Sequence, residues 1–243
     1  MNVRRQTGFT LTELLVSMGL SLGLIAAVLT SYVGTFTHSM ATLDASRLNH
    51  EMNSLLGLMS NDIRRAGYWG SLDVNEDPIA NPFNQMGQTT LTVYNSMANN
   101  TAVGSTGNGS CIVFAYDMNG DGVVDPEELT GFRLNNGVVQ VRVSGTPGTA
   151  ASCATLGDVW EDLTDARLVT VTSLNFDLAG SACINIEDAD ALDCYAVAPA
   201  AGDMTVETRE VRITLEGALT EDDFVRFTQS HSVRVRNELI REF

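Results

Sequence analysis

The stretch that decides the fold is GFTLTELLVSMGLSLGLIAAVLTSYVGTF, residues 8–36, which follows a seven-residue leader containing Arg4 and Arg5. No residue from Leu14 to Leu43 carries a fixed charge, and a membrane-spanning helix needs only about 20 apolar residues. Because basic residues stay on the cytoplasmic side, we expect the leader inside and the rest of the chain outside. An ordinary signal peptide is cut after its apolar core. Here the small residue Gly8 lies before the core, so a cut there leaves the helix on the mature chain.

Glu13 is the one carboxylate at the start of this apolar run. A charge at the centre of a membrane helix costs about 2.5–3.5 kcal/mol, and less near the interface. If the chain is cut after Gly8, the new ammonium group on Phe9 of one copy and Glu13 of a neighbouring helix neutralise each other in a low-dielectric bundle. The alternative is an uncleaved membrane anchor with a tolerated acid near its end.

This segment resembles the prepilin N-terminus of the type IV filament superfamily, through Gly8, Phe9, Thr10, Leu11 and Glu13 and the apolar run behind them. The resemblance implies that a prepilin peptidase cuts after Gly8 and that Phe9 is N-methylated. It also implies that Glu13 helps to register the subunit in a helical filament. Many major pilins have a helix-kinking proline midway along this segment, and this chain has none there.

The apolar run is expected to continue as an amphipathic helix that ends before Gly67. Its apolar stripe recurs at steps of three and four residues, at Leu48, Met52, Leu55, Met59 and Ile63. We therefore expect a leader at 1–8, a long helix at 9–66 and an exported head at 67–243. Within the helix, residues 9–38 form the transmembrane or filament-core part and residues 39–66 the amphipathic part.

The head is expected to consist mainly of strands. Residues 67–110 are rich in Gly, Asn, Pro and Ser and predict a long surface loop with one weak strand near Leu91–Tyr94. Beyond them we expect about five to seven mostly antiparallel strands. These lie at Cys111–Tyr116, Gly131–Leu134, Val138–Val143, Leu168–Leu178, Val206–Leu215 and Phe224–Arg236, with a hairpin turn at Asn135-Asn136-Gly137. Strands and helices do not alternate, so the fold class is α+β: a pilin-like long N-terminal helix packed against a mostly antiparallel β-sheet head.

Residues 117–128, DMNGDGVVDPEE, fit the twelve-residue calcium loop D-x-[DN]-x-[DN]-G-x₅-E. The oxygen donors expected for Ca²⁺ are the side chains of Asp117, Asn119, Asp121, Asp125 and Glu128 and the carbonyl of Val123. Gly122 permits the sharp turn, and Val124 is apolar where such loops pack inward. A strand precedes the loop and no second loop follows, so we expect a clamp that stabilises the head, not an opening sensor. The alternative is an acid-rich turn without metal.

The four cysteines, all beyond the apolar run, predict two disulfides in an exported domain. Three connectivities are possible. The short spacing favours Cys183–Cys194, which leaves Cys111–Cys153, and free buried thiols are the alternative. An acidic cluster lies between Cys183 and Cys194; its residues are Glu187, Asp188, Asp190 and Asp193. It predicts a solvated loop more readily than a second cation site.

The chain has 30 acidic and 14 basic residues, a formal net charge of −16. Loss of Arg4 and Arg5 with the leader would make it −18. Such a surface disfavours direct nucleic-acid binding. The three histidines, His38, His50 and His231, form no catalytic motif with a nucleophile, and no phosphate-binding or hydrolase motif occurs. We therefore expect no enzymatic activity.

Two further segments resemble PilW-like minor pilins: the helix exit Asp62–Gly70, DIRRAGYWG, and Val233–Asn237, VRVRN. The resemblance implies a low-abundance subunit at the pilus tip that helps to initiate assembly with other minor and major pilins and carries a tip adhesin. It also implies roles in twitching motility, adhesion and DNA uptake. The protein would sit in the inner membrane as a single-pass protein with its head in the periplasm, and then in the pilus. One alternative is a type II secretion minor pseudopilin. The other is a monomeric membrane-anchored calcium-binding protein.

Overall fold

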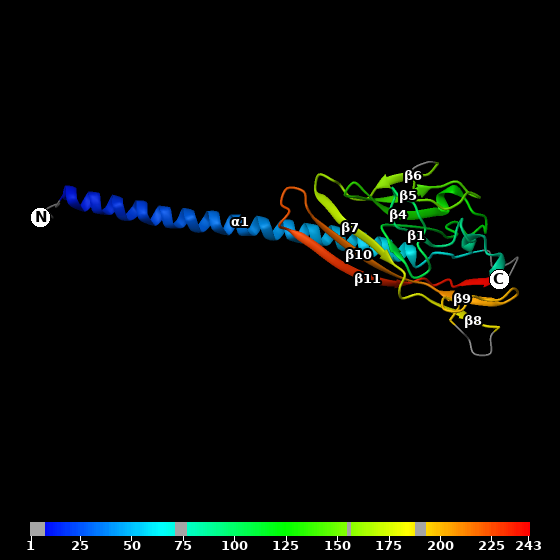
Figure 1. Ribbon diagram of the computed structural model, residues 1–243. Helices are drawn as coiled ribbons and strands as arrows, with labels where there is room; N and C mark the ends of the chain where they lie inside the picture. The colour runs from blue at the N-terminus through cyan, green and yellow to red at the C-terminus, as the bar shows by residue number, and fades with distance from the viewer. Residues whose placement is uncertain (1–7, 71–76, 155–156, 188–192) are drawn as a thin grey trace, which may run out of the picture. The chain divides into compact units, whose positions relative to one another are not determined.

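The computed structural model describes residues 8–70, 77–154, 157–187 and 193–243, and Figure 1 follows the chain through them. The chain divides into two compact units, Met1–Arg47 and Leu48–Phe243. Helix α1 (Leu11–Ile63, 53 residues) begins in the first unit and ends in the second. It lies within the expected range 9–66, with its ends two and three residues inside that range.

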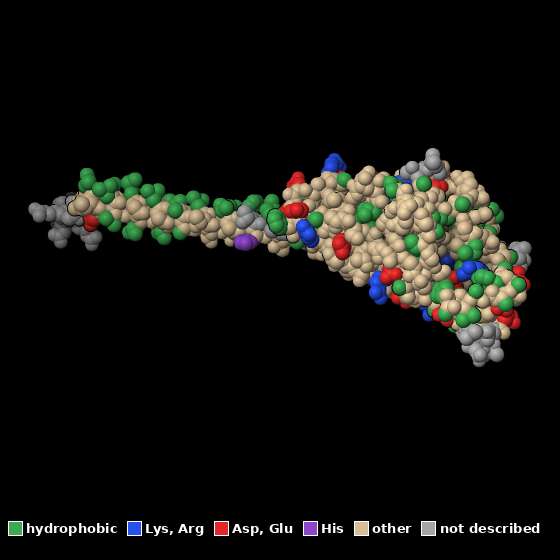
Figure 2. Space-filling model, in the orientation of Figure 1, with side chains coloured by type: hydrophobic (Ala, Val, Ile, Leu, Met, Phe, Trp, Pro, Cys, Tyr) green, Lys and Arg blue, Asp and Glu red, His purple; other side chains and the backbone are tan. Residues whose placement is uncertain are grey.

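In the first unit, apolar side chains are exposed on every face of α1. Leu11, Leu20, Leu24 and Val28 each expose between 66% and 78% of their surface, and Figure 2 shows such side chains along the helix. Within the described residues, α1 is the one helix that is long and apolar enough to cross a membrane. A helix that is apolar all round requires lipid or other helices to cover it.

In the second unit, the last part of α1 buries one stripe in the core. The five positions expected from the periodicity are buried, with exposed fractions of 0–7%; they are Leu48, Met52, Leu55, Met59 and Ile63. Leu56 and Ala66 are buried beside them. The stripe that the 3.6-residue period of the helix predicts is therefore the one that packs into the core.

The strands of the second unit form three antiparallel sheets among the described residues (Figure 1). The five-stranded sheet has the order β1 (Thr92–Tyr94), β3 (Cys111–Ala115), β4 (Leu129–Asn135), β5 (Val138–Ser144) and β6 (Val159–Asp162). The four-stranded sheet has the order β11 (Arg226–Arg234), β10 (Glu210–Leu219), β7 (Val169–Asp177) and β2 (Asn108–Gly109). The three-stranded sheet has the order β12 (Leu239–Glu242), β9 (Met204–Thr208) and β8 (Ala182–Asn185). Three 3₁₀ turns are η1 (Pro78–Ala80), η2 (Pro82–Asn84) and η3 (Pro126–Glu128).

One hydrophobic core joins α1 to two of the sheets. Phe114 and Phe132 enter it from the five-stranded sheet, and Phe176, Ile213 and Leu215 from the four-stranded sheet. All five are at most 1% exposed. The fold is therefore the expected α+β arrangement, with a long apolar N-terminal helix and antiparallel sheets. Burial of large apolar side chains from both kinds of element is what holds it together.

The expected hairpin around Asn135-Asn136-Gly137 joins β4 to β5. Asn136 has φ 50° and Gly137 has φ 81°, and two consecutive positive φ values are what a two-residue type I′ turn requires. The strand pairing closes at Asn135 opposite Val138. This prediction is confirmed. It could be made from the sequence because the type of a two-residue turn depends on the residues in the turn itself.

The expectation of a single strand over Val206–Leu215 is wrong. The chain forms β9 and β10, which belong to different sheets, with Arg209 between them. Arg209 is 3% exposed, and its guanidinium donates to Thr90 Oγ1 (2.9 Å) and Asn84 Oδ1 (3.1 Å). Burial lowers the pKa of Arg209 to about 10. Burial alternates across this residue, but polar side chains occupy the buried positions Thr205, Glu207 and Arg209. Hydrophobic periodicity therefore does not show where the two strands divide.

Two other expectations need correction. Residues 67–110 are not entirely a surface loop, because Phe83 and Leu91 are buried at 0% and 6% exposure. Phe83 packs with Ala115 and Leu129 in a small cluster of its own. The structure also has more strands than expected. The additional ones, β2, β6, β8 and β12, have two to four residues each, which is too short for an alternating pattern to be recognised.

Candidate functional site

The N-terminal end of α1 carries the residues expected for processing and assembly. Gly8 and Phe9 precede the helix, and Phe9 exposes 88% of its surface. Glu13 lies in the first turn, where its Oε2 accepts hydrogen bonds from Thr10 N–H (3.0 Å) and Thr10 Oγ1–H (2.8 Å). Thr10 Oγ1 in turn accepts from Glu13 N–H (3.3 Å). Arg4 and Arg5 lie outside the described residues.

This reciprocal bonding between Thr10 and Glu13 is a capping box. The pattern T-x-x-E at residues 10–13 carries the signal for it, and the interpretation of Glu13 as an intermolecular partner overlooked this local role. The capping box fixes the carboxylate at the beginning of the helix, four residues from Phe9. An acid in the first turn also interacts favourably with the helix dipole.

The candidate calcium loop connects β3 to β4, so it joins two strands and not two helices. Asp117 comes two residues after the end of β3, and Glu128 ends η3 directly before β4. The strand before the loop was expected from the sequence. Val124 is partly buried against the cluster that contains Phe83, Ala115 and Leu129, so it packs inward as expected.

Asp117 is the buried centre of the loop, at 3% exposure. Its Oδ1 accepts from Gly120 N–H (2.6 Å), and its Oδ2 accepts from Gly122 N–H (3.0 Å) and Gly70 N–H (2.9 Å). Gly122 has φ 77°, a left-handed conformation that favours glycine. A Cβ atom on Gly70 would lie 2.9 Å from Gly120 Cα. The close approach of the helix exit to the loop therefore depends on glycine at position 70.

Glu128 is buried on the other side of the loop, at 2% exposure. Its Oε1 accepts from Met118 N–H (2.7 Å), and its Oε2 accepts from Asp125 N–H (3.0 Å). Among the ion pairs of the described residues, none includes Asp117 or Glu128. Burying a carboxylate without compensation is costly, and backbone N–H groups provide the compensation here.

The remaining side chains of the loop are on its exposed side. The Asn119 amide donates from Nδ2 to Asp121 Oδ2 (3.0 Å) and to Asp125 Oδ2 (3.4 Å). Its Oδ1 accepts from Asp121 N–H (2.9 Å), and Asp121 Oδ1 accepts from Val123 N–H (2.8 Å). The two carboxylates therefore both face the positively polarised end of one amide group.

The loop supplies the chemistry that Ca²⁺ requires, because every expected donor is a hard oxygen atom. The structure places the carboxylates of Asp121 and Asp125 within hydrogen-bonding distance of the Asn119 amide. It turns Asp117 and Glu128 toward backbone N–H groups. Within the described part of the chain, no three acidic, histidine or cysteine side chains converge around a point that a metal ion could occupy.

The helix exit and the C-terminal segment that resemble PilW-like minor pilins meet in space. Arg236 N–H donates to Arg64 O (3.1 Å), and the Asn237 amide donates to Arg65 O (3.2 Å) and Ala66 O (3.1 Å). These carbonyls belong to the turn that directly follows α1. Arg65 O also accepts from Tyr68 N–H (2.9 Å) within that turn, and the C-terminal segment adds the bonds from Arg236 and Asn237. Sequence analysis placed a strand here but gave no sign of this contact, which links residues about 170 positions apart.

The helix exit is also bonded to the strand that leads into the candidate calcium loop. Gly67 N–H donates to Ala115 O (2.8 Å), and Asp117 N–H donates to Tyr68 O (2.9 Å). Together with the bond from Gly70 N–H to Asp117, these contacts hold the helix exit against the beginning of the loop. A cation bound by Asp117 would therefore act on the junction between helix and sheet.

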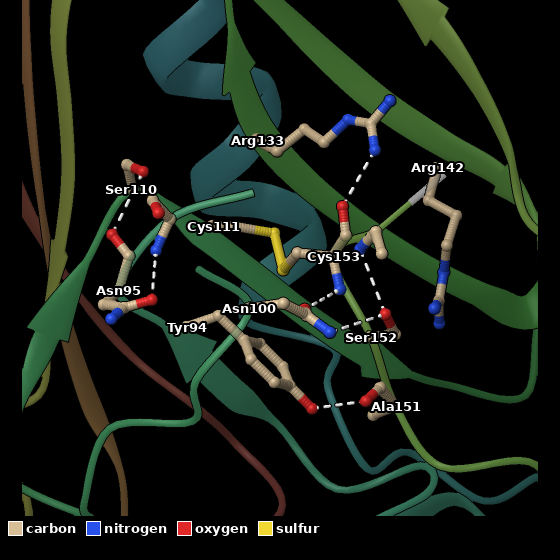
Figure 3. The surroundings of a disulfide bond; sticks show 12 residues. Tyr94, Asn95, Asn100, Ser110, Cys111, Arg133, Arg142, Ala151, Ser152 and Cys153 are labelled. Carbon is tan, nitrogen blue, oxygen red and sulfur yellow. Dashed lines mark hydrogen bonds between the residues drawn. A yellow bond between two sulfur atoms is a disulfide. The ribbon is translucent and has the colours of Figure 1, made fainter. Parts of the chain in front are cut away.

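The structure pairs Cys111 with Cys153 and Cys183 with Cys194, the pairing favoured by the spacing. Figure 3 shows how the loop around Cys153 is held. Arg133 donates to Cys153 O (2.8 Å), Cys153 N–H donates to Asn100 Oδ1 (2.7 Å), and Tyr94 Oη–H donates to Ala151 O (2.5 Å). Arg133 also lies 4.1 Å from the ring centre of Trp160. This disulfide is part of a dense structural network.

Other residues singled out in the sequence are scattered. In the acidic cluster, Asp188 and Asp190 lie outside the described residues, and Asp193 Oδ1 accepts from Tyr195 N–H (2.9 Å). His38 and His50 lie on α1 and His231 lies on β11, where it is exposed. The structure does not bring these histidines into one site.

One known protein family matches most of this chain. The family model described as PpdB, prepilin peptidase-dependent protein B, matches residues 41–235, which is well over half of the chain. The chain belongs to this family. No curated protein and no solved structure gives a significant match. Membership of the prepilin peptidase-dependent protein B family makes this chain a type IV pilin-related protein that depends on a prepilin peptidase.

The family match and the N-terminal motif are independent observations. The prepilin peptidase-dependent protein B match begins at residue 41, whereas Gly8, Phe9 and Glu13 lie before it. The match covers the last part of α1 and all the described strands except β12, and it includes the helix exit and the candidate calcium loop. The features of the N-terminus and the features of the folded unit therefore point to the same class of protein from different residues.

Proposed function

We propose that this chain is a minor pilin of a type IV pilus that lies at the pilus tip and helps to initiate assembly with other minor and major pilins. A prepilin peptidase cuts after Gly8, and Phe9 becomes the N-methylated first residue. The mature protein is held in the inner membrane with its folded unit in the periplasm until it enters the filament. At the tip it serves motility, adhesion and DNA uptake and carries an adhesin.

The observation that supports this proposal is the exposure of apolar residues on every face of α1 in the first unit. Leu24 and Val28 expose 68% and 66% of their surface. Each such side chain gains about 1.5–3 kcal/mol when an apolar environment replaces water. Lipid provides this environment before assembly, and the helices of other subunits provide it afterwards. A membrane anchor alone accounts for the first environment but not for the second.

In this proposal, Glu13 determines the position of the helix relative to its neighbours in the filament. Its carboxylate is held at the start of α1 by Thr10, close to where cleavage creates the Phe9 ammonium group. In a helical bundle, this carboxylate pairs with the ammonium group of a neighbouring subunit. Leaving one member of a buried pair without its partner costs about 3–5 kcal/mol. The pair therefore favours one axial position of the subunit over others.

The tip position draws its support from the resemblance of Asp62–Gly70 and Val233–Asn237 to PilW-like minor pilins. These two segments hydrogen-bond to each other at the end of α1. A type II secretion minor pseudopilin would share the N-terminus and the long helix, and the identity of the filament separates the two.

The loop 117–128 holds one Ca²⁺ ion in this proposal. Asp117, Asn119, Asp121, Asp125 and Glu128 provide side-chain oxygens, and Val123 provides its carbonyl. The ion replaces the Asn119 amide as the positive group that Asp121 and Asp125 face. Because Asp117 also accepts from Gly70, the ion strengthens the junction between α1 and the five-stranded sheet. The role is structural.

The experiment that tests the assignment combines mass spectrometry with filament purification. Pili are sheared from cells that produce the native chain, and the N-terminus of the protein in the filament fraction is sequenced by mass spectrometry. We expect N-methylated Phe9 as the first residue, and we expect the protein in pili at low abundance. A chain that retains its leader, or that stays entirely in the membrane fraction, contradicts the proposal. Recovery from a periplasmic secretion pseudopilus instead of surface pili identifies the minor pseudopilin.

Glu13→Gln tests the pairing directly, because glutamine keeps a hydrogen bond to Thr10 and removes the charge. We expect normal membrane insertion and cleavage, with incorporation into filaments reduced by about tenfold or more, since a loss of even 1.4 kcal/mol is tenfold. Glu51→Gln, on the same helix but in the second unit, is the matched control and should assemble normally. Wild-type incorporation of Glu13→Gln would remove the pairing from the account.

A further inference from the structure

A cavity of about 500 Å³ lies beside the end of α1. Its walls include Arg64 and Arg65 from the helix end, Arg236 from the segment after β11, and the rings of Tyr68 and Tyr116. Arg64 and Arg236 are neighbours because Arg236 N–H donates to Arg64 O (3.1 Å). The fold therefore gathers three of the 14 basic residues around one hollow in a strongly acidic protein.

These three arginines are not neutralised by ion pairs within the described part of the chain. The Arg65 guanidinium lies 5.7 Å from the ring centre of Tyr116, and Asp62 acts on it electrostatically. Asp117 also lines the cavity, but three backbone N–H groups already bond to its carboxylate. The guanidinium groups are therefore the groups with bonding capacity left for a ligand.

The residues that line the cavity indicate which class of ligand it can bind. Guanidinium groups bind carboxylates through paired hydrogen bonds. Tyr68, which is 45% exposed, provides a flat ring for an apolar or aromatic side chain. The net charge of −16 repels long polyanions such as nucleic acids. A short acidic peptide carries only a few charges, and one or two of its side chains fit a hollow of this size.

We propose that this cavity is a docking site for an acidic segment of a partner protein, in which a Glu or Asp side chain binds Arg64 and Arg236 and an adjacent aromatic residue packs on Tyr68. The site lies wholly in the second unit, and the proposal does not depend on the pilus assignment or on calcium. It gives the contact between the helix end and the C-terminal segment a second role, since that contact places the two arginines together.

The test uses the full mature chain in a non-ionic detergent and the fluorescein-labelled peptide amide Gly-Glu-Phe-Glu-Gly-Ser. Binding is followed by fluorescence anisotropy at low salt and at physiological salt. We expect saturable binding that weakens with salt, and about tenfold weaker binding for Gly-Gln-Phe-Gln-Gly-Ser. Arg64→Gln and Arg236→Gln should each weaken binding of the glutamate peptide about tenfold, which corresponds to the loss of one charged contact. Arg212→Gln, at an exposed arginine of β10 outside the cavity, is the matched control and should bind normally.

Thermal melting of each variant verifies that it is folded. If Arg236→Gln lowers the melting temperature markedly, Arg236→Lys replaces it; this variant keeps the charge but not the planar fork, and should weaken binding by less than the Gln variant of Arg64 does. The proposal is overturned if the peptide does not bind at about 1 mM or if the glutamate and glutamine peptides bind equally. It is also overturned if Arg212→Gln weakens peptide binding as much as the cavity variants do. Tighter binding of a ten-nucleotide oligothymidine than of the peptide also overturns it.

Discussion

At the scale of single residues, buried arginines distinguish this head from an ordinary apolar core. Arg133, Arg142 and Arg209 are each at most 4% exposed. Burial lowers the pKa of Arg142, and the neighbouring Asp158 opposes that effect. Arg142 donates from Nε to Leu129 O (2.8 Å) and from a terminal nitrogen to Asp158 (3.1 Å). The guanidinium group therefore connects the beginning of β4 to the segment before β6.

Asp158→Ala should destabilise the protein strongly. The side chains of Arg142 and Asp158 are 4% and 10% exposed, so the substitution leaves a buried cation without its counter-ion. We expect a loss of about 3 kcal/mol in the free energy of unfolding, or about 6–12 °C in melting temperature for a chain of this size. Circular dichroism of the full chain in detergent measures it.

Asp165→Ala is the matched control for this prediction. Asp165 forms a similar pair with Arg167 (2.7 Å), but both side chains are on the surface. Arg167 holds the pKa of Asp165 at about 2, and exposed pairs contribute little to stability. The melting temperature of Asp165→Ala should be close to that of the native chain. Equal effects of the two substitutions would mean that burial does not decide the cost.

At the scale of elements, the loop between β3 and β4 carries the sharpest prediction. Addition of about 1 mM Ca²⁺ should raise the melting temperature of the full chain relative to EDTA, because an ion that binds only the folded state stabilises it by about 2.7 kcal/mol at a hundredfold excess over Kd. Asp121→Asn should abolish most of this difference. Its Oδ1 can still accept from Val123 N–H, so the metal-free fold is preserved while a ligand charge is lost.

Asp177→Asn is the control for the loop variant. Asp177 Oδ1 accepts from Ala179 N–H (2.9 Å), the same local bond that Asp121 makes, but Asp177 lies at the end of β7. This variant should keep the full response to Ca²⁺. Identical melting curves of the native chain in Ca²⁺ and in EDTA would contradict the calcium proposal.

The elements that could be predicted from the sequence are those whose hydrophobic pattern repeats several times or whose turn has a specific sequence. The helical stripe from Leu48 to Ile63 repeats over four turns, and Asn136-Gly137 fits one turn type. The two-residue strand β2 has no period to detect. The division between β9 and β10 also escapes detection, because the buried positions there carry polar side chains such as Glu207 and Arg209. The burial of Arg209 depends on Asn84 and Thr90, more than 100 residues earlier in the chain.

The candidate site was predictable to a similar degree. The order of donors in residues 117–128 is visible in the sequence, because the spacing of a metal loop is local. The bond between Asp117 and Gly70 is not visible, since it joins segments 47 residues apart. The capping role of Glu13 is local and was available from T-x-x-E. The cavity between Arg64 and Arg236 arises only when the two ends of the folded unit meet.

At the scale of the whole molecule, the apolar part of α1 is long enough to cross a membrane, and its role as an anchor can be tested. Leu24→Arg should reduce membrane integration sharply, because arginine at the centre of a spanning helix costs about 2.5–3.5 kcal/mol on insertion scales. Leu24 is 68% exposed, so the change removes no internal packing. The measurement is the fraction of chain that stays in membranes after alkaline carbonate extraction.

Ser46→Arg is the control for the insertion variant. Ser46 is exposed, lies on the same helix beyond the apolar run and is next to Arg47. Its substitution should leave the membrane fraction unchanged. Full retention of Leu24→Arg in membranes would show that the centre of the apolar run is not inside the bilayer.

The hydrogen bonds at the end of α1 have a mechanical consequence. Traction applied to the helix does not reach the sheets through the covalent chain alone. It is shared with the end of β3 through Gly67, and with the segment after β11 through Arg236 and Asn237. Both sets of hydrogen bonds must break before the helix can separate from the sheets, so a pulling force is distributed over strands far apart in the sequence. We therefore expect this fold to resist force better than one whose helix is bonded to a single strand.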